Sequence, residues 1–232
     1  VTLEIKDSKN NSIRLFRSDD PSYPIPPVNI PLYWIRPQQG LSAAAGAHRF
    51  LWDMHYTPLN TAPAYPIAAV FGNTAPQPTS PWVMPGNYTA ILTVNGQSYT
   101  QSFTIKMDPR VKTATKDLQE QHDYSLACYS NRIKAASYLD KIIAYRKKNT
   151  NLSKELDQQL STFAGAVSRG RGAVPKEASF GSLINGFDRL LQNLQQADVP
   201  ATQQTIEAVN KLMASFSILE KNWIAFESTK LN

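Results

Sequence analysis

The sequence predicts two domains, an antiparallel β-sandwich over residues 1–107 followed by an up-and-down four-helix bundle over residues 108–232. Apolar residues alternate with polar ones in the first half and recur at three- and four-residue steps in the second. Thirteen of the sixteen prolines lie in the first half, where turns rather than helices are expected. With 232 residues, 42% hydrophobic and 18% charged, the chain is long and apolar enough to fold.

Three strands are expected before residue 57. Residues 1–5 and 13–17 alternate apolar and polar side chains on either side of a polar turn at residues 7–11, which predicts a hairpin. Residues 49–56 alternate in the same way. One face of that third strand would carry four large apolar side chains, Phe50, Trp52, Met54 and Tyr56.

The clearest local signal is the Asn95-Gly96 pair, which lies between alternating segments at residues 87–94 and 97–107. Both residues tolerate positive φ, as a two-residue type I′ hairpin turn requires. Such a turn would pair Val94 with Gln97, Leu92 with Tyr99 and Ala90 with Gln101. Five or more strands with Pro-rich connections and no helix between them are typical of an antiparallel sandwich.

Four amphipathic helices are expected after Asp108. The first is long, with Thr113 or Thr115 as its N-terminal cap. Its apolar stripe comprises Leu118, His122, Ser125 or Leu126, Tyr129, Ile133, Ala136, Leu139 and Ile143. The stripes of the other three occupy residues 152–167, 183–194 and 206–226, and Pro200 is expected to open the last helix.

Composition excludes several classes of protein. The net charge of +6 lacks the basic runs of a dedicated nucleic-acid-binding protein, so no nucleic-acid partner is expected. No apolar run approaches the ~18 residues of a membrane span. The lone Cys128 excludes an intramolecular disulfide and a multi-cysteine zinc site, and its position predicts a small residue in a helix packing face.

The histidines are the candidate acid–base or metal-binding groups. Asp53 and His55 share one face of an expected strand and His48 is near them in sequence. Catalytic zinc usually needs three protein ligands, however, and no second ligand-rich segment is present. His122 lies on an apolar helix stripe, which favours a hydrogen-bonded interface histidine. We therefore expect no catalytic residue, no cofactor and no metal in this chain.

Two other polar segments are interpreted as solvated loops. Asp19-Asp20 would suit a glycosidase only if the two carboxylates flanked a scissile bond, but adjacent residues point apart and prolines follow them. The loop at residues 169–172 carries two arginines and two glycines, a pattern that could contact phosphate or lipid headgroups. Two arginines on a flexible connector are more often a solvated loop, which is the interpretation favoured here. No nucleotide-binding, serine-hydrolase or zinc-protease motif occurs.

Aromatic side chains in the Pro-rich stretch are the remaining candidates for a binding surface. Trp34 and Trp52 are expected to bury their large area in the sandwich core. Tyr65, Phe71 and Trp82 fit either the core or a surface that binds a protein partner or a sugar. These three residues are the candidates for a surface that binds a partner or a sugar.

An ordered series of motifs resembles a known family. Residues 45–53 (AGAHRFLWD) and 84–92 (MPGNYTAIL), with the opening VTLEIKD, residues 99–111 and the ending from Trp223, resemble the C-terminal region of bacterial sortilin-like, BNR-repeat β-propeller proteins. These proteins are secreted and often labelled glycosyl hydrolases. The resemblance implies an immunoglobulin-like sandwich, with at least one strand before Val1. His48 and Ala114 depart from the pattern, which usually has Asn and a capping Ser there.

The resemblance and the residues together predict a non-catalytic accessory or interaction region at the C-terminus of an exported β-propeller protein. It would pack on its own propeller or dock to a cell-envelope protein, and the protein would be periplasmic, outer-membrane-associated or extracellular in a bacterium. Docking would use the loops of residues 57–85 or exposed helix faces. The alternative is a carbohydrate-binding accessory region of a glycoside hydrolase. Any glycosidase activity would then belong to the upstream propeller.

Overall fold

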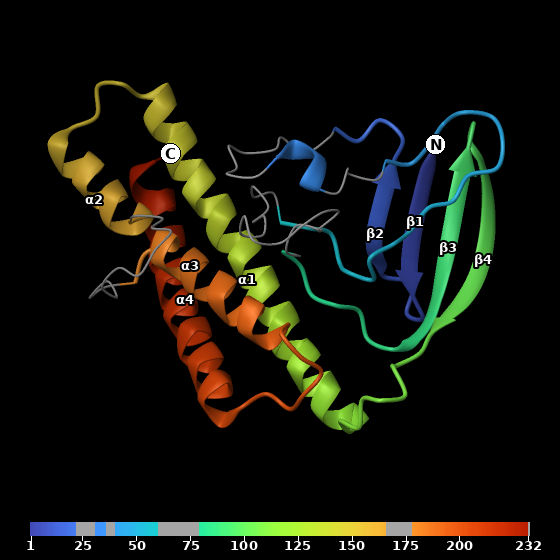
Figure 1. Cartoon of the computed structure of the whole chain (residues 1–232). Helices are drawn as coiled ribbons and strands as arrows, with labels where there is room; N and C mark the ends of the chain where they lie inside the picture. Colours follow the sequence, from blue (N-terminus) through green and yellow to red (C-terminus); the bar gives the residue numbers. More distant parts are fainter. Residues whose placement is uncertain (22–30, 36–39, 60–78, 166–177, 232) are drawn as a thin grey trace. The chain divides into compact units, whose positions relative to one another are not determined.

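The described residues of the chain form a four-stranded antiparallel sheet followed by four α-helices (Figure 1). The computed structural model describes residues 1–21, 31–35, 40–59, 79–165 and 178–231. It divides into two compact units, Val1–Lys112 and Thr113–Asn232. The expected order, a sheet domain and then a helical domain, is confirmed.

The sheet contains β1 (Thr2–Asp7), β2 (Ser12–Arg17), β3 (Gly86–Val94) and β4 (Gln97–Ile105) in the spatial order β2-β1-β3-β4. Both expected hairpins are confirmed. The β3–β4 register includes Val94 opposite Gln97, Leu92 opposite Tyr99 and Ala90 opposite Gln101. Asn95 and Gly96 have φ of 51° and 82°, so the turn between them is the type I′ turn that the sequence predicts.

One face of the sheet is apolar and the other is polar. Ile5, Ile13, Val83 and Tyr88 form the buried core on the apolar face, and Trp52 and Phe103 pack against it. On the opposite face, threonine and serine side chains face one another across β3 and β4, as in the Thr93–Ser98 pair with 2.9 Å between hydroxyl oxygens. This is the alternation expected of a sheet with one covered face.

The expected strand at residues 49–56 is wrong. The structure has no strand there, only an isolated bridge between His55 and Trp82. Met54 has a φ of 58°, which interrupts the period-two alternation of an extended chain. His55 is therefore buried and Met54 exposed, the reverse of what the alternation predicts for these two residues, whereas Trp52 and Tyr56 pack against the core of the sheet. The indole N–H of Trp52 donates to the carbonyl of His55 and stabilises this bend.

The helical unit contains α1 (Thr115–Lys148), α2 (Lys154–Ala164), α3 (Phe180–Leu194) and α4 (Gln203–Lys230). A short 3-10 helix, η1 (Leu32–Trp34), belongs to the first unit. None of the described helices combines the length and apolarity needed to cross a membrane.

Two helix starts differ from the expectation. Ala114 is the N-cap of α1, and its methyl side chain has no acceptor for a capping bond, while the hydroxyl of Thr113 donates to the carbonyl of Asp198. Thr202 caps α4, so Pro200 precedes the helix rather than opening it. α2 and α3 begin at the serines Ser153 and Ser179, whose hydroxyls accept from backbone amides. The expected stripe residue Val167 lies outside the described residues.

The helical core is built around large side chains of α3 and α4. Its fully buried aromatic members are Trp223, Phe180 and Phe187. The stripe predicted for α1 is wrong in part, because Ile133 and Ile143 are exposed. α1 packs chiefly against α3, and its small residues Cys128 and Ala135 allow the two helices to approach closely.

Candidate functional site

Only one of the three predicted surface aromatics can be placed. Tyr65 and Phe71 lie outside the described residues, as do residues 169–172. Trp82 is described, and its side chain lies beside the segment that contains Asp53 and His55. The candidate site is therefore the surface around Trp82.

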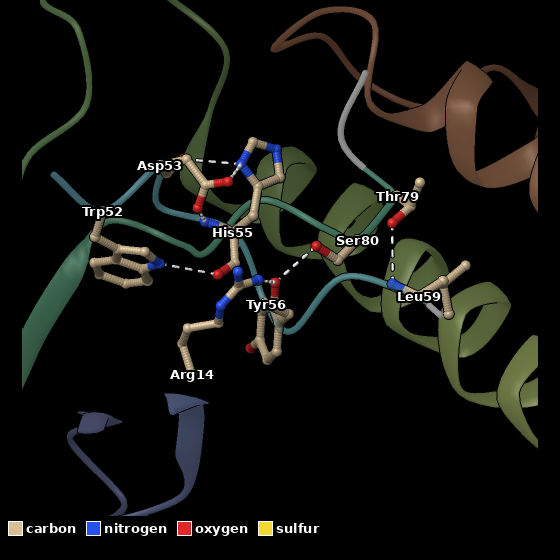
Figure 2. Close-up of polar contacts among 8 residues, drawn as sticks. All are labelled: Arg14, Trp52, Asp53, His55, Tyr56, Leu59, Thr79 and Ser80. Atoms are coloured by element: carbon tan, nitrogen blue, oxygen red, sulfur yellow. Dashed lines mark hydrogen bonds and ion pairs between the residues drawn. The ribbon is translucent and has the colours of Figure 1, made fainter. Parts of the chain in front are cut away.

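Two short segments of backbone pair to form the base of this site. The amide of Tyr56 donates to the carbonyl of Pro81 at 3.0 Å, and the amide of Val83 donates to the carbonyl of Met54 at 2.9 Å. Two side chains reinforce the pairing: Ser80 Oγ donates to the carbonyl of Tyr56, and Thr79 Oγ1 accepts from the amide of Leu59 (Figure 2). These hydrogen bonds hold residues 54–59 against residues 79–83.

Trp82 is held by contact with a buried histidine. The ring centroids of His55 and Trp82 are 3.9 Å apart, with an interplanar angle of 40°. His55 is only 3% exposed, whereas Trp82 is 43% exposed. One part of the indole thus packs on the protein while a large part faces outward. A rotamer fixed in this way presents an aromatic surface with little further loss of side-chain entropy on binding.

The imidazole of His55 makes its hydrogen bond within its own segment. Its Nδ1 lies 2.8 Å from the carbonyl oxygen of Asp53, so this nitrogen carries the proton and donates. The Asp53 carboxylate accepts from the backbone amide of His55, as Figure 2 shows. The buried Nε2 has no hydrogen-bond partner among the described residues. Burial lowers the pKa of His55 from its ordinary value of 6.5, and the charge of Arg14 lowers it too, while Asp53 opposes the shift.

Arg14 is a site residue that the sequence analysis missed. Its guanidinium, which extends from β2, donates to the carbonyl of Tyr56 at 2.8 Å (Figure 2). This bond connects the paired segments of residues 54–59 and 79–83 to the sheet. It also lies over the ring of Phe16, 4.7 Å from the centroid. A signal was available, because period-two alternation places Arg14 on the same strand face as Phe16, where a charged residue needs a partner.

The other sequence candidates are not brought into this site by their contacts. His48 Nε2 contacts the carbonyl of Ala44 at 2.8 Å. Asp20 accepts from the backbone amide of Arg17, which makes it a turn residue. His122 belongs to α1 in the other unit, where burial lowers its pKa. Within the described ranges, no group of three or more His, Cys, Asp or Glu could hold a metal ion.

Cys128 is buried in the helical core, and burial raises the pKa of its thiol to about 12. A thiol with such a pKa stays protonated at neutral pH and is a poor nucleophile. The side chain fills space between α1 and its neighbours, as the sequence predicts.

Comparison with known proteins gives no match: no family model, no curated protein and no solved structure matches this chain.

Acidification is expected to destabilise the unit that contains His55. An unfolded His55 takes up a proton near pH 6.5, whereas the folded one does so only at lower pH. The contribution of neutral His55 to the free energy of unfolding is fully present above about pH 6.5. It is lost as the pH falls from there towards the lower pKa of the folded state. Urea unfolding at a series of pH values should show that the free energy of unfolding falls less with acidification in His55→Gln than in the unchanged protein. Equal losses would contradict this assignment.

Proposed function

We propose that this chain is a non-catalytic accessory region that binds a protein partner through the surface around Trp82. In this proposal it forms the C-terminal part of an exported bacterial β-propeller protein. It packs on that propeller or docks to another protein of the cell envelope. The protein is then periplasmic, outer-membrane-associated or extracellular.

The observation that carries the proposal is the indole of Trp82, which is 43% exposed and packs on the buried ring of His55. Tryptophan is among the residues most often found at the energetic centre of protein interfaces, because it contributes a large apolar area with few rotatable bonds. Here the ring is supported by His55 and by the backbone pairing of Tyr56 with Pro81. A rigid support of this kind reduces the entropy cost of binding.

Exposed apolar residues that precede His55 favour a protein over a sugar as the partner. Leu51 is 67% exposed and Met54 is 41% exposed, and both come shortly before the bridge between His55 and Trp82 in the sequence. Exposed aliphatic side chains and an exposed indole are both typical of protein interfaces. The polar groups of His55 and Asp53 are engaged in local hydrogen bonds, which suits a structural role better than acid–base catalysis.

Carbohydrate binding is the second candidate function. An indole face can stack on a sugar ring, and the carboxylate of Asp53, 60% exposed in its side chain, could accept hydroxyl hydrogen bonds beside it. In that case the region would serve as the sugar-binding accessory of a glycoside hydrolase, with the reaction carried out by the upstream propeller.

The proposed architecture is an immunoglobulin-like sandwich joined to an up-and-down four-helix bundle. The sheet would be one layer of the sandwich, which agrees with the concentration of Ile5, Tyr88 and Phe103 on a single face. For the bundle, the support is that α3 packs against both α1 and α4. Reading the residues encoded before Val1 tests the wider context: β-propeller repeats would support it, and an unrelated start would overturn it.

Trp82→Ala is expected to weaken binding of the separately expressed upstream propeller by about 30-fold or more, because interface tryptophans contribute about 2 kcal/mol or more. Isothermal titration calorimetry measures the dissociation constant. Trp82→Phe keeps an aromatic ring on His55 and should recover part of the affinity. Circular dichroism verifies that each variant is folded.

A matched control separates this surface from the exposed helix faces. Ile218 of α4 is 64% exposed, and Ile218→Ala should leave the affinity unchanged. A loss caused by Ile218→Ala but not by Trp82→Ala would place docking on the helices instead. A glycan array probed with the whole chain tests the alternative: glycan binding that disappears in Trp82→Ala would favour the carbohydrate function over the protein one.

A further inference from the structure

β4 lies at one edge of the sheet that the described strands form. β3 occupies its other side over the whole strand, from Gly86 opposite Ile105 to Val94 opposite Gln97. No strand within the described parts of the chain pairs with the outer side, and Figure 1 shows β4 as the last strand of the sheet. Side chains 97–102 and 104 are all exposed. A strand of this length presents an open edge of about 30 Å.

The two edges of the sheet differ in how they resist pairing with other chains. β2 carries two arginines, Arg14 and Arg17, and charged side chains are a common protection of edge strands. β4, with the sequence QSYTQSFTI, contains no charged residue, no proline and no glycine. It consists of residues that either favour strands or are neutral and polar. Of the two edge strands in the described sheet, β4 is therefore the one whose own sequence lacks these protective residues.

The turn geometry determines which backbone groups face outward. In a two-residue type I′ hairpin the residues flanking the turn form a hydrogen-bonded pair, so Val94 and Gln97 are bonded to each other. Alternate residues from Gln97 onward then bond to β3. The even-numbered residues, Ser98, Thr100, Ser102 and Thr104, direct their N–H and C=O groups away from the sheet. Consistent with this, the carbonyl of Ser102 accepts a bond from the side chain of Gln101.

β4 is complementary to a second copy of itself. Antiparallel pairing about Gln101 places Tyr99 opposite Phe103, Gln97 opposite Ile105, Ser98 opposite Thr104 and Thr100 opposite Ser102 of the other copy. In this register the outward-facing residues meet as hydrogen-bonded pairs. The apolar faces of both sheets lie on the same side, and the serines and threonines lie on the other.

The aromatic residues support this register. Tyr99 is 54% exposed and belongs to the same strand face as Phe103, which packs against Trp52 and Tyr88. Tyr99 and Phe103 would meet at a non-hydrogen-bonded position, where side chains approach most closely, and aromatic cross-strand pairs are stabilising there. The arrangement is a closed two-fold pairing, so it does not propagate into a fibre.

We propose that two copies of this chain associate through antiparallel pairing of β4 with β4, which forms one continuous eight-stranded sheet. The proposal does not depend on the function assigned to Trp82. Because a single strand pair buries less area than a standard interface of about 1,600 Å², we expect a weak and reversible dimer.

Charge substitution at the two-fold axis tests the proposal. Gln101→Lys and Gln101→Glu each bring like charges face to face in a homodimer, and each should weaken association at least about tenfold. An equimolar mixture of the two variants brings opposite charges together and should restore the dimer. Sedimentation velocity from about 5 to 500 µM measures all three samples and the unchanged chain. Gln101 is exposed, so both variants are expected to fold.

A backbone substitution provides an independent arm. Ser102→Pro removes an outward N–H that β3 does not use, so it should abolish the dimer while Ser102→Ala retains it. An unchanged chain that stays monomeric at about 500 µM would overturn the proposal. A dimer that persists in both charged variants and in Ser102→Pro would also overturn it, because the contact would then lie elsewhere.

Discussion

Trp223→Ala is expected to lower the free energy of unfolding of the helical unit by about 4 kcal/mol, the range found when a large buried aromatic is truncated. Trp223 of α4 is fully buried. Its ring centroid lies 5.3 Å from that of Phe163 and 5.9 Å from that of Phe180, so it joins α2, α3 and α4. Removal of the indole leaves a cavity at the place where these three helices meet.

Urea unfolding followed by circular dichroism at 222 nm measures this loss, because the helices dominate that signal. Ile218→Ala is the control on the same helix, since Ile218 is exposed and should change stability by less than about 0.5 kcal/mol. A loss below about 1 kcal/mol in Trp223→Ala would contradict the packing described for this core.

Asp188→Ala is expected to lower the free energy of unfolding of the helical unit by about 3 kcal/mol, because it removes the carboxylate that pairs with the buried guanidinium of Arg132. Arg132 of α1 is buried, and its Nε donates to Asp188 Oδ1 of α3 at 3.1 Å. Without this partner, the cation is desolvated and loses its compensating charge. The cost should exceed that of breaking a comparable pair on the surface.

The matched surface pair is Lys141 with Glu227, which join α1 and α4 at 3.1 Å with the lysine more than half exposed. Glu227→Ala should cost less than about 1 kcal/mol. The double variant Arg132→Met, Asp188→Leu replaces the ion pair with apolar groups and should be less destabilised than Asp188→Ala alone. Equal effects at the two pairs would show that burial of Arg132 is energetically unimportant.

The parts of the fold that were predictable have local causes. Asn95-Gly96 determines the β3–β4 register because its two positive φ values allow only one kind of short turn. The apolar stripe of α4 was also correct: Val209, Phe216, Leu219 and Trp223 are all buried. The prediction of a strand at residues 49–56 was wrong because Met54 adopts positive φ. The apolar and polar side chains do alternate there, but this pattern does not reveal the backbone conformation of Met54.

The apolar stripe predicted for α1 was wrong in part because packing against another helix determines which of its residues are buried. Ile133 and Ile143 are the larger apolar residues, yet the buried face of α1 carries Cys128, Arg132 and Ala135. Close packing against α3 favours small residues at the contact, and an arginine is accepted there because α3 supplies Asp188. No pattern within α1 alone contains this information.

The candidate site could be predicted only in part. Trp82 was singled out from the sequence as an aromatic in a Pro-rich segment, and the structure places it on the surface beside His55. Its contact with His55 was not predictable, and neither were the hydrogen bonds from Ser80 and Arg14 to the carbonyl of Tyr56, because these contacts join separate segments that meet only in the folded chain. Long-range contacts of this kind leave no periodic signal in one sequence.

Photo-cross-linking from position 82 tests the proposed function most directly. p-Benzoylphenylalanine in place of Trp82 keeps an aromatic ring at this position and reacts with whatever covers it in the whole natural protein, expressed in its own cell envelope. The proposal predicts an adduct with a protein, either the upstream propeller or an envelope partner, identified by mass spectrometry and absent when the probe is at position 218. An adduct with oligosaccharide alone, or no adduct from position 82, would contradict it.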